Sequence, residues 1–482
     1  MAAVMLQGTG SDVGKSVLVA GLCRALANRG LRVRPFKPQN MSNNAAVTAD
    51  GGEIGRAQAL QALACRIEPT VDMNPVLLKP QGDRTSQVIV HGRVRGTTGS
   101  DYFRGGRAAL LAPVLESYHR LQAEADIVVV EGAGSPAEIN LRAGDIANMG
   151  FARAASVPVI LVGDIDRGGV IASLVGTHAV LDPADTAMIA GFIINKFRGD
   201  PRLFDDGIAE IARRTGWRGL GVVPWLVAAT LLPAEDAVVL DRRTTGSGRI
   251  RIAVPMLPRI ANFDDFDPLR LEPEVELIMV PPGAPLPGDA ALIILPGTKA
   301  TIADLGFVRA QGWDIDIAAH VRRGGRLLGI CGGYQMLGQS ITDPEGVEGP
   351  VESVAALGHL PVATRLTATK QLRRIGGTGL GGAAFAGYEI HVGETHHLEA
   401  LAPLLARDGL GPDGAVSADG RIAGCYAHGL FDHRDQRAAW LAVLGGVSDG
   451  ADHPARVDAA LDEIAAALEA CLDIDFILKI AA

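Results

Sequence analysis

Short, uninterrupted apolar runs recur along the first half of the chain, and helix-like stretches lie between them. The runs are rich in Val, Ile and Leu, which is typical of strands buried on both faces of a parallel sheet. They cover residues 3–7, 127–130, 157–162 and 191–194. Helical patterns cover residues 15–28, which Gly30 ends, and residues 105–125. This alternation predicts a doubly wound α/β domain over residues 1–235.

The pattern changes after residue 233, where the stretch DRRTTGSGR is polar, charged and rich in Gly and Ser. We interpret residues 236–249 as a linker. Apolar runs resume at residues 251–257, 291–295 and 326–330, and they predict a second doubly wound α/β domain over residues 250–440. Within this domain, the glycine-rich segment 376–382 predicts a mobile loop.

The last segment, residues 441–482, is predicted to be a helical tail. Apolar residues recur in it at helical spacing, at Val457, Leu461, Ile464, Leu468 and Leu472. Such a stripe packs either on its own domain or on a partner helix, and we favour packing on its own domain.

Composition narrows the class of protein. Of 482 residues, 48% are apolar and 21% are charged, which excludes extensive disorder. The net charge of −9 argues against a nucleic-acid partner, because phosphate backbones are bound by basic surfaces. Five scattered cysteines without a C-x-x-C pair indicate a reducing compartment. Without a signal-peptide pattern or an apolar run of about 18 residues, we expect a cytoplasmic protein with no membrane span. The sequence leaves open whether the protein forms a homo-oligomer.

A glycine-rich turn with the sequence GTGSDVGKS, residues 8–16, lies between the first predicted strand and the first helix. Backbone N–H groups and the helix dipole converge at such a turn and bind phosphate. We expect Lys15 to reach the β- and γ-phosphates of ATP and the Ser16 hydroxyl to bind Mg²⁺. The strict G-x-x-x-x-G-K-[ST] pattern has glycine where this chain has Thr9. The other candidate ATP-binding residues of the turn are Gly10, Asp12, Val13 and Gly14.

Polar residues also follow other predicted strands. Glu131 ends the strand at 127–130 and is a candidate ligand for the metal or its water. Asn195, after the strand at 191–194, either contacts an adenine edge or caps a turn. Asp50 is a further candidate metal ligand. The amide-rich loop KPQNMSNN suits either a substrate bearing many carboxylates and amides or a plain turn; its candidate substrate residues are Gln39, Asn40 and Asn43.

A cysteine lies between an apolar run and a helical stretch, in the segment GICGG, residues 329–333. This places Cys331 in a G-x-C-x-G turn, the cysteine form of a nucleophile elbow. The start of the following helix favours the reactive thiolate. The backbone N–H groups of Gly332 and of Gly297, in the turn after residues 291–295, are candidate oxyanion donors. A buried structural cysteine is the alternative.

A thiolate nucleophile needs a histidine base, and the chain has 11 histidines. His428, in the segment CYAHGLF, follows a short apolar run and precedes a glycine, so we prefer it. His391, His396 and His397 stay open as alternatives on the residues alone.

Together these motifs resemble known proteins over about residues 3–440. GICGGYQMLG with YAHGLF resembles the class I glutamine amidotransferase domain, which uses a cysteine thiolate. GTGSDVGKS with VEGAGS resembles the nucleotide site of dethiobiotin synthetase and its P-loop relatives. The fusion of the two in this order resembles the glutamine-hydrolysing corrinoid amidases. KPQNMSNN, GEIGRAQ, NPVLLKP and the Asn195 loop are similar to the cobyric acid synthase family among them.

This resemblance implies a cytoplasmic ligase that uses ATP, Mg²⁺ and L-glutamine, with no tightly bound organic cofactor. It implies amidation of the b, d, e and g carboxylates of adenosylcobyrinic acid a,c-diamide, through an acyl phosphate and ammonia released at a cysteine thioester. The family's nucleophile falls on Cys331 and its base on His428.

One position departs from most amidotransferases, which carry a glutamate two residues after the histidine. Leu430 stands there in this chain, as in other corrinoid amidases. Asp265, in the segment ANFDDFDP, is our candidate for the orienting carboxylate, and orientation by water or backbone is the alternative.

Two other functions stay open. One is the sister activity, cobyrinic acid a,c-diamide synthase, which shares the domain layout. The other is a regulatory P-loop ATPase of the partition type with an inactive amidotransferase-like domain. The second lysine typical of those P-loops, in K-G-G-x-G-K-[ST], is absent here, which weakens that alternative.

Overall fold

The apolar runs of the first half form a six-stranded parallel sheet. The computed structural model describes residues 2–82, 84–99, 106–235, 244–245 and 248–482. In it the strand order is β12 (Arg218–Pro224), β11 (Ile189–Phe197), β10 (Val159–Asp164), β1 (Ala2–Gly8), β9 (Ile127–Glu131) and β2 (Val33–Phe36). The predicted linker 236–249 lies mostly outside the described residues.

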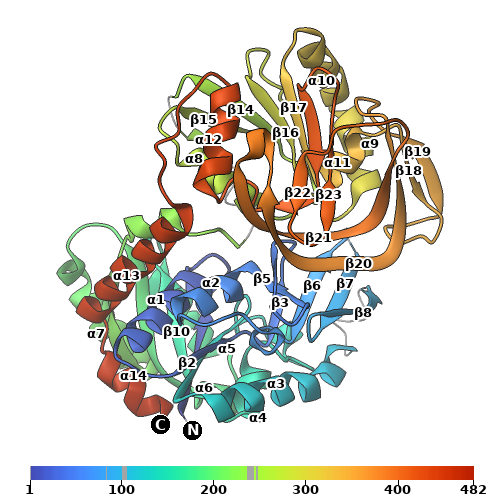
Figure 1. Cartoon of the computed structure of the whole chain (residues 1–482). Coiled ribbons are helices and arrows are strands. Elements are labelled where there is room, and N and C mark those ends of the chain that lie inside the picture. The colour runs from blue at the N-terminus through green and yellow to red at the C-terminus, as the bar shows by residue number, and fades with distance from the viewer. Residues whose placement is uncertain (1, 83, 100–105, 236–243, 246–247) are drawn as a thin grey trace.

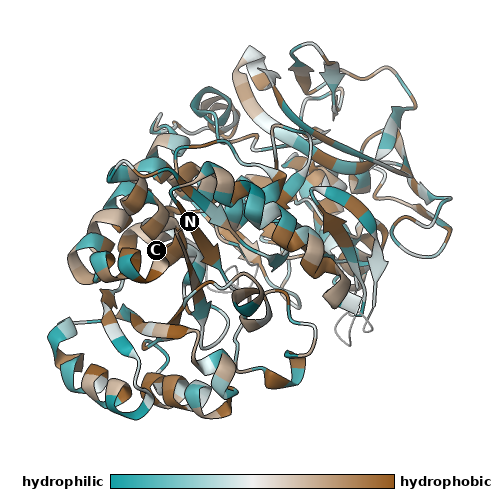
Figure 2. Cartoon of the chain, turned by 90° about the horizontal axis from the view of Figure 1, so that it is seen from below, coloured by the Kyte–Doolittle hydropathy of each residue, from teal (hydrophilic) through white to brown (hydrophobic). Residues whose placement is uncertain are grey.

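Helices cover both faces of this first sheet, as the alternation of side chains along β1 requires. Ala3 and Met5 pack on a face covered by α3 (Leu111–Glu124), α4 (Met149–Ala154), α5 (Val170–Val180) and α7 (Asp205–Thr215). Val4 and Leu6 pack on the other face, under α1 (Lys15–Asn28) and the two C-terminal helices. The strands are accordingly apolar along their length between the helices (Figure 2).

Smaller β-structures sit beside this sheet and face the second lobe (Figure 1). One is a four-stranded sheet, in the order β3 (Gln39–Met41), β6 (Val76–Pro80), β7 (Ser86–Val90) and β8 (Arg93–Thr98). The other is the hairpin of β4 (Ala45–Val47) and β5 (Glu53–Gly55), which leads directly into α2 (Arg56–Ala64). The short helix α6 (Pro183–Thr186) joins α5 to β11.

The second lobe is built on a seven-stranded sheet. Its order is β13 (Thr244–Thr245), β15 (Val275–Val280), β14 (Ile250–Pro255), β16 (Leu292–Leu295), β17 (Arg326–Ile330), β25 (Ile422–Cys425) and β24 (Ala415–Val416). The two edge strands are antiparallel to their neighbours and the five inner strands are parallel. Its helices are α8 (Asp267–Arg270), α9 (Thr301–Ala310), α10 (Trp313–Arg322), α11 (Gly332–Leu337) and α12 (Arg434–Val443). The predicted fold class, two doubly wound α/β domains, is confirmed.

A further sheet in this lobe was not predicted from the sequence. It contains β19 (Glu352–Ala355), β18 (Ser340–Asp343), β20 (Val362–Thr378), β21 (Ala384–His397) and β26 (Ala427–His428); β22 (Leu405–Arg407) pairs with β20, and β23 (Gly411–Asp413) pairs with β22. The prediction of a mobile loop over 376–382 is wrong in its first part, because residues 376–378 pair with β21 and residues 377–378 also pair with β22. The turn beyond residue 378 contains a short 3-10 helix, Leu380–Gly382.

The C-terminal helices α13 (His453–Cys471) and α14 (Ile474–Ala481) return to the first lobe (Figure 1). The predicted stripe faces α1, where Gly21 is necessary because a Cβ there would lie 2.6 Å from Ile464. Arg24 of α1 is fully buried and pairs with Asp458 and Asp462 of α13. The expectation that the stripe packs on its own domain is therefore corrected: it packs on the first domain of the same chain. Among the described residues, no helix is long and apolar enough to cross a membrane.

Candidate active sites

The glycine-rich turn joins β1 to α1 at the C-terminal edge of the first sheet. Asp12 and Gly14 both have positive φ, 57° and 90°, so the chain curls with its amides toward one point. Lys15 Nζ donates to the backbone oxygens of Gly10, at 3.1 Å, and Gly134, at 3.2 Å. Burial lowers the pKa of Lys15, against the opposing charge of Glu131. The turn thus has the geometry of a phosphate-binding loop.

Asn195 stabilises this loop by a hydrogen bond to its backbone. Its Nδ2 donates to the backbone oxygen of Val13 at 2.8 Å, and a Cβ on Gly14 would lie 2.4 Å from the same nitrogen. Val13 is itself buried in the apolar core. Asn195 and Val13 are not among the described residues that line the neighbouring cavity. The structure therefore shows Asn195 holding the shape of the loop, and its contact with an adenine edge stays a prediction.

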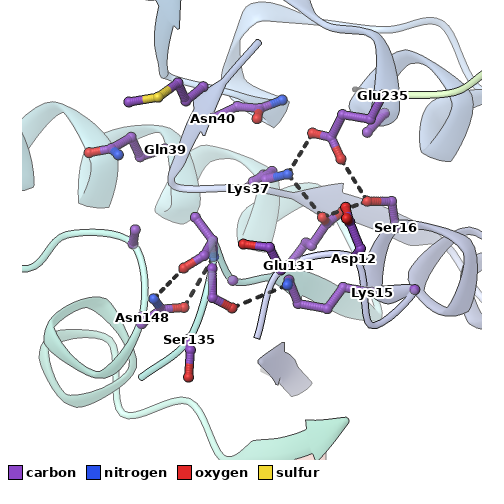
Figure 3. Close-up of a pocket in the computed structure, with 18 of the residues that line it drawn as sticks. Asp12, Lys15, Ser16, Lys37, Gln39, Asn40, Glu131, Ser135, Asn148 and Glu235 are labelled. Atoms are coloured by element: carbon purple, nitrogen blue, oxygen red, sulfur yellow. Dashed lines mark hydrogen bonds and ion pairs between the residues drawn. The ribbon is translucent and has the colours of Figure 1, made fainter. Parts of the chain in front are cut away.

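Two carboxylates meet at the Ser16 hydroxyl (Figure 3). Ser16 Oγ lies 2.8 Å from Glu131 Oε1 and 2.8 Å from Glu235 Oε2. Lys37 Nζ donates to the same pair, at 2.9 Å to Glu131 and 2.7 Å to Glu235. Burial opposes the charge of Lys37, but the two carboxylates raise its pKa well above the usual value. The single Ser16 hydroxyl proton cannot make a full hydrogen bond to both carboxylates. Hydroxyl and carboxylate oxygens are ligands of hard cations, so this group of oxygens suits a hard cation.

Lys37 and Glu235 are site residues that no sequence motif indicated. Lys37 directly follows β2, which pairs with β9, so its position at the same sheet edge as Glu131 could have been inferred from the strand pattern. Glu235 reaches the site from the end of a long excursion after β12, and no local pattern in the sequence indicates this.

A cavity of about 610 Å³ opens from the phosphate-binding loop. Gln39 and Asn40, two of the candidate substrate residues, line it. Asn148 also lines it and holds the loop after β9 by accepting from the Ala133 N–H at 3.1 Å. Its other polar lining residues include Asp12, Lys15, Arg107, Arg142, Arg167 and Lys196.

Two predicted site residues do not reach this cavity. Asp50 lies in the exposed turn of the β4–β5 hairpin, where its carboxylate accepts the Thr48 hydroxyl proton, and it is not among the described lining residues. The prediction of Asp50 as a metal ligand is corrected on this ground. Asn43 is half-buried and also absent from the described lining, whereas Asn44 beside it bonds across to the second lobe.

Cys331 occupies a sharp turn between β17 and α11. Its backbone has φ 54° and ψ −112°, an unusual conformation for a residue with a side chain. The turn is so tight that a Cβ on Gly329 would lie 2.6 Å from the Gly333 oxygen, and one on Gly333 would lie 2.1 Å from the Leu295 oxygen. The glycines on each side of the turn are therefore required, as in a nucleophile elbow.

His428 and Asp265 lie together beside this turn. Asp265 Oδ2 is 2.7 Å from His428 Nδ1, and Oδ1 accepts the Gly429 N–H at 2.7 Å, so the carboxylate is held at both oxygens. Burial lowers the pKa of His428, but Asp265 and the hydrogen bond to the Cys331 side chain outweigh burial and raise the pKa to about 10. The three side chains thus form a Cys–His–Asp arrangement.

The alternative histidines do not fit this role. His391 lines the same cavity as Cys331, but its ring stacks on Tyr426 with centroids 3.7 Å apart and burial lowers its pKa to about 3, whereas His428 has the carboxylate partner Asp265. His396 and His397 are exposed at the end of β21. Of the candidate oxyanion residues, Gly332 lines the cavity at Cys331, whereas Gly297 packs on the His428 ring, which a Cβ there would approach to 2.8 Å.

A small cavity of about 40 Å³ adjoins Cys331 and His428. Glu348 lines it, and burial raises the pKa of Glu348 to about 7 against the opposing charge of Lys299. Thr301 Oγ1 lies 3.0 Å from Gln335 Oε1 and 3.1 Å from Glu348 Oε1, which fixes this polar wall. Lys79 of the first lobe lines the same cavity, so both lobes enclose it. The cavity offers polar contacts to a small zwitterion at a thiol nucleophile.

Comparison with known families defines the class of each lobe. Residues 4–239 match the CobQ/CobB/MinD/ParA nucleotide binding domain, and residues 251–436 match the CobB/CobQ-like glutamine amidotransferase domain. The chain is thus an amidating ligase that joins a nucleotide-binding domain to a glutamine amidotransferase domain.

Full-length relatives narrow the class further. Cobyric acid synthase of Sphingopyxis alaskensis is 67% identical over 100% of this chain and 99% of its own length. Cobyric acid synthase of Rhizorhabdus wittichii is 66% identical with the same coverage. Among solved structures, PurLQS from Thermotoga maritima aligns at 18% identity over 44% of this chain and 97% of that chain, with a TM-score of 0.30. The chain belongs to the cobyric acid synthase family.

Proposed function

We propose that this protein is a cobyric acid synthase. It amidates the b, d, e and g carboxylates of adenosylcobyrinic acid a,c-diamide, using ATP and the amide nitrogen of L-glutamine. The observation that carries the proposal is the 66–67% identity to curated cobyric acid synthases over the whole chain. In the structure, Lys79 from the nucleotide-binding lobe lines the same cavity as Cys331 and His428. Nitrogen released at the thiol therefore starts its path at the boundary with the lobe that consumes it.

The amidotransferase lobe releases ammonia. Cys331 Sγ attacks the amide carbon of glutamine, and a carbon–sulfur bond forms as the carbon–nitrogen bond breaks. His428 gives its proton to the leaving nitrogen and then takes one from the water that hydrolyses the thioester to glutamate. Asp265 holds the imidazole in orientation and favours its charged form.

The nucleotide-binding lobe activates the acceptor. A carboxylate oxygen of the corrinoid attacks the γ-phosphorus of ATP and ADP leaves, giving an acyl phosphate. Lys15 and the amides of the glycine-rich turn stabilise the charge on the phosphates. Ammonia then attacks the acyl carbon and inorganic phosphate leaves. Cationic and amide groups of the large cavity, such as Arg142 and Asn40, suit a ring that carries many carboxylates.

Mg²⁺ fits the oxygens around Ser16. Glu131 and Glu235 would hold it with the Ser16 hydroxyl, and it would supply charge neutralisation at the phosphates. Among the described residues, no cluster of three or more His, Cys, Asp or Glu side chains could hold a metal ion by itself.

The test is mass spectrometry of the purified protein incubated with ATP, Mg²⁺ and glutamine. One reaction contains adenosylcobyrinic acid a,c-diamide and the other contains cobyrinic acid. We expect four carboxyl-to-amide conversions of the a,c-diamide, with glutamine and ATP consumed. Conversion of cobyrinic acid to its a,c-diamide and no further would show the sister activity. Failure of both reactions would refute the proposal.

A further inference from the structure

Arg56, from the nucleotide-binding lobe, reaches into the surroundings of the glutaminase base. It is the first residue of α2, and its side chain is 15% exposed. Arg56 Nη2 donates to the Ala45 backbone oxygen at 3.1 Å and to the Tyr388 hydroxyl, and it pairs with Asp264 Oδ2 at 3.0 Å. Tyr388 and Asp264 both belong to the second lobe, so the side chain spans the interface.

Each partner of Arg56 is adjacent to the Cys–His–Asp arrangement. The Tyr388 ring stacks on the His428 ring, with centroids 5.3 Å apart and an interplanar angle of 20°. The two residues are also paired across β21 and β26. Asp264 directly precedes Asp265, whose carboxylate holds His428 Nδ1. Arg56 therefore fixes the face of the imidazole on one side and the backbone that carries its carboxylate on the other.

Arg56 also supplies positive charge to a crowded acidic region. Burial and neighbouring carboxylates raise the pKa of Asp264 to about 6 although Arg56 opposes this, and they raise the pKa of Asp432 to about 8. Without a cation here, the charges of Asp264 and Asp265 would repel one another next to His428. The lobes are also joined close by, because Asn262 accepts from the Ala45 N–H at 3.2 Å and Asn44 accepts from the Phe263 N–H at 3.2 Å.

We propose that Arg56 is a positioning residue of the glutaminase centre, supplied across the interface by the nucleotide-binding lobe. It acts through Tyr388 and Asp264 to hold His428 against Cys331. The amidotransferase lobe then has a complete base only when docked on the other lobe. The inference rests on the proposed glutaminase half-reaction and goes beyond it, since the mechanism gives Arg56 no role and the GEIGRAQ segment that contains it does not indicate one.

The first experiment compares Arg56→Met with Arg374→Gln in the full-length protein. Arg374 pairs with Glu68 across the same interface at 2.5 Å, but both side chains are largely exposed. Steady-state glutamine hydrolysis gives kcat and KM, ammonium-driven amidation reports on the other site, and thermal unfolding reports on folding. We expect Arg56→Met to lower the glutaminase kcat about 100-fold, because misplacing a reacting group is that costly, with KM for glutamine nearly unchanged. Arg374→Gln should change neither constant.

A parallel loss of ammonium-driven amidation, or an equal effect of Arg374→Gln, would show that Arg56 only holds the lobes together and would overturn the proposal. An unchanged kcat in Arg56→Met would overturn it too. If Arg56→Met does not fold, Tyr388→Phe decides, because it keeps the ring stacked on His428 and loses only the hydroxyl that Arg56 contacts. We expect a lower kcat at constant KM for Tyr388→Phe, and wild-type kinetics would contradict the proposal.

The double variant Arg56→Met/Tyr388→Phe tests whether the two residues act together. If Arg56 acts through Tyr388, its glutaminase kcat is about that of Arg56→Met alone. If the two residues act independently, the two fold losses of kcat multiply. Multiplying effects would overturn the route through Tyr388. A wild-type protein that hydrolyses glutamine but amidates no corrinoid would refute the proposed function and leave this inference standing. In that case thermal unfolding alone would report whether the Arg56 variants still fold.

Discussion

The two reaction centres of this chain differ in how many of the reacting groups the protein itself supplies. At the glutaminase centre, Cys331, His428 and Asp265 are at most 7% exposed, and His428 contacts both of the other side chains. The cavity beside them measures about 40 Å³. At the nucleotide centre, the cavity measures about 610 Å³, and Lys37 bridges two carboxylates that suit a metal ion.

This difference follows the chemistry of the two half-reactions. A covalent step on a small amide needs a nucleophile and base fixed in advance, so the protein builds them into the lobe and its interface. Phosphoryl transfer to a large corrinoid leaves most of the charge balance to ATP and Mg²⁺, so the protein supplies the cradle and the complementary charges. Variants at the first centre should therefore act on glutamine alone, and variants at the second on every nitrogen source.

The largest effect is expected from Asp265→Asn. We predict that glutamine hydrolysis falls about 10,000-fold, as when the carboxylate of a catalytic triad is neutralised, while ammonium-driven amidation persists. Asp265 raises the pKa of His428 against burial, so its loss lowers that pKa from about 10. The alkaline limit of the residual glutaminase should accordingly move to lower pH. A pH profile of kcat/KM that keeps its alkaline limit would contradict this role of Asp265.

Lys15→Met tests the nucleotide centre. We predict that amidation falls about 100- to 1,000-fold with glutamine and with ammonium alike, because one preorganised charge on the phosphates is lost. Glutamine hydrolysis, followed as glutamate release, should remain. Amidation at the wild-type rate in this variant would show that the turn at residues 8–16 does not bind the reacting phosphates.

Glu235→Gln should give a smaller effect that depends on the metal concentration. Replacing a group that orients a metal's ligands typically costs about 10- to 100-fold, and we expect at least that here. Amidation should therefore fall at low Mg²⁺ and recover in part as Mg²⁺ is raised. Asp50→Asn is the matched control, because the structure places Asp50 in an exposed turn. Titration of amidation against Mg²⁺ measures both variants. A shifted midpoint in Asp50→Asn but not in Glu235→Gln would reverse the assignment of the metal site.

The sequence predicted the parts of each centre that are local in the chain. A buried strand, a glycine-rich turn and a helix start identify both Lys15 with Ser16 and Cys331, since each motif fits in about ten residues. The parallel-sheet rule adds Glu131, because strand ends meet at one edge. The pairing of His428 with Asp265 joins residues 163 positions apart, and the choice of Asp265 rested only on its place after the first strand of the second domain.

What the sequence did not predict depends on contacts between distant segments. The strands β20 and β21 are mostly half-exposed and carry many polar residues, so their apolar alternation is weak. An apolar stripe such as that of α13 identifies a buried face but not the surface that it covers, and here it covers α1. Lys37 and Glu235 meet only because β2 and the segment after β12 end at the same cavity.

The most direct test of the account follows the nitrogen itself in Cys331→Ala. The variant is incubated with ATP, Mg²⁺ and adenosylcobyrinic acid a,c-diamide, first with amide-labelled ¹⁵N-glutamine and then with ¹⁵N-ammonium, and the corrinoid is analysed by mass spectrometry. The account predicts label in the product from ammonium and none from glutamine. Label arriving from glutamine, or amidation lost with both nitrogen sources, would contradict a division of labour between the two centres.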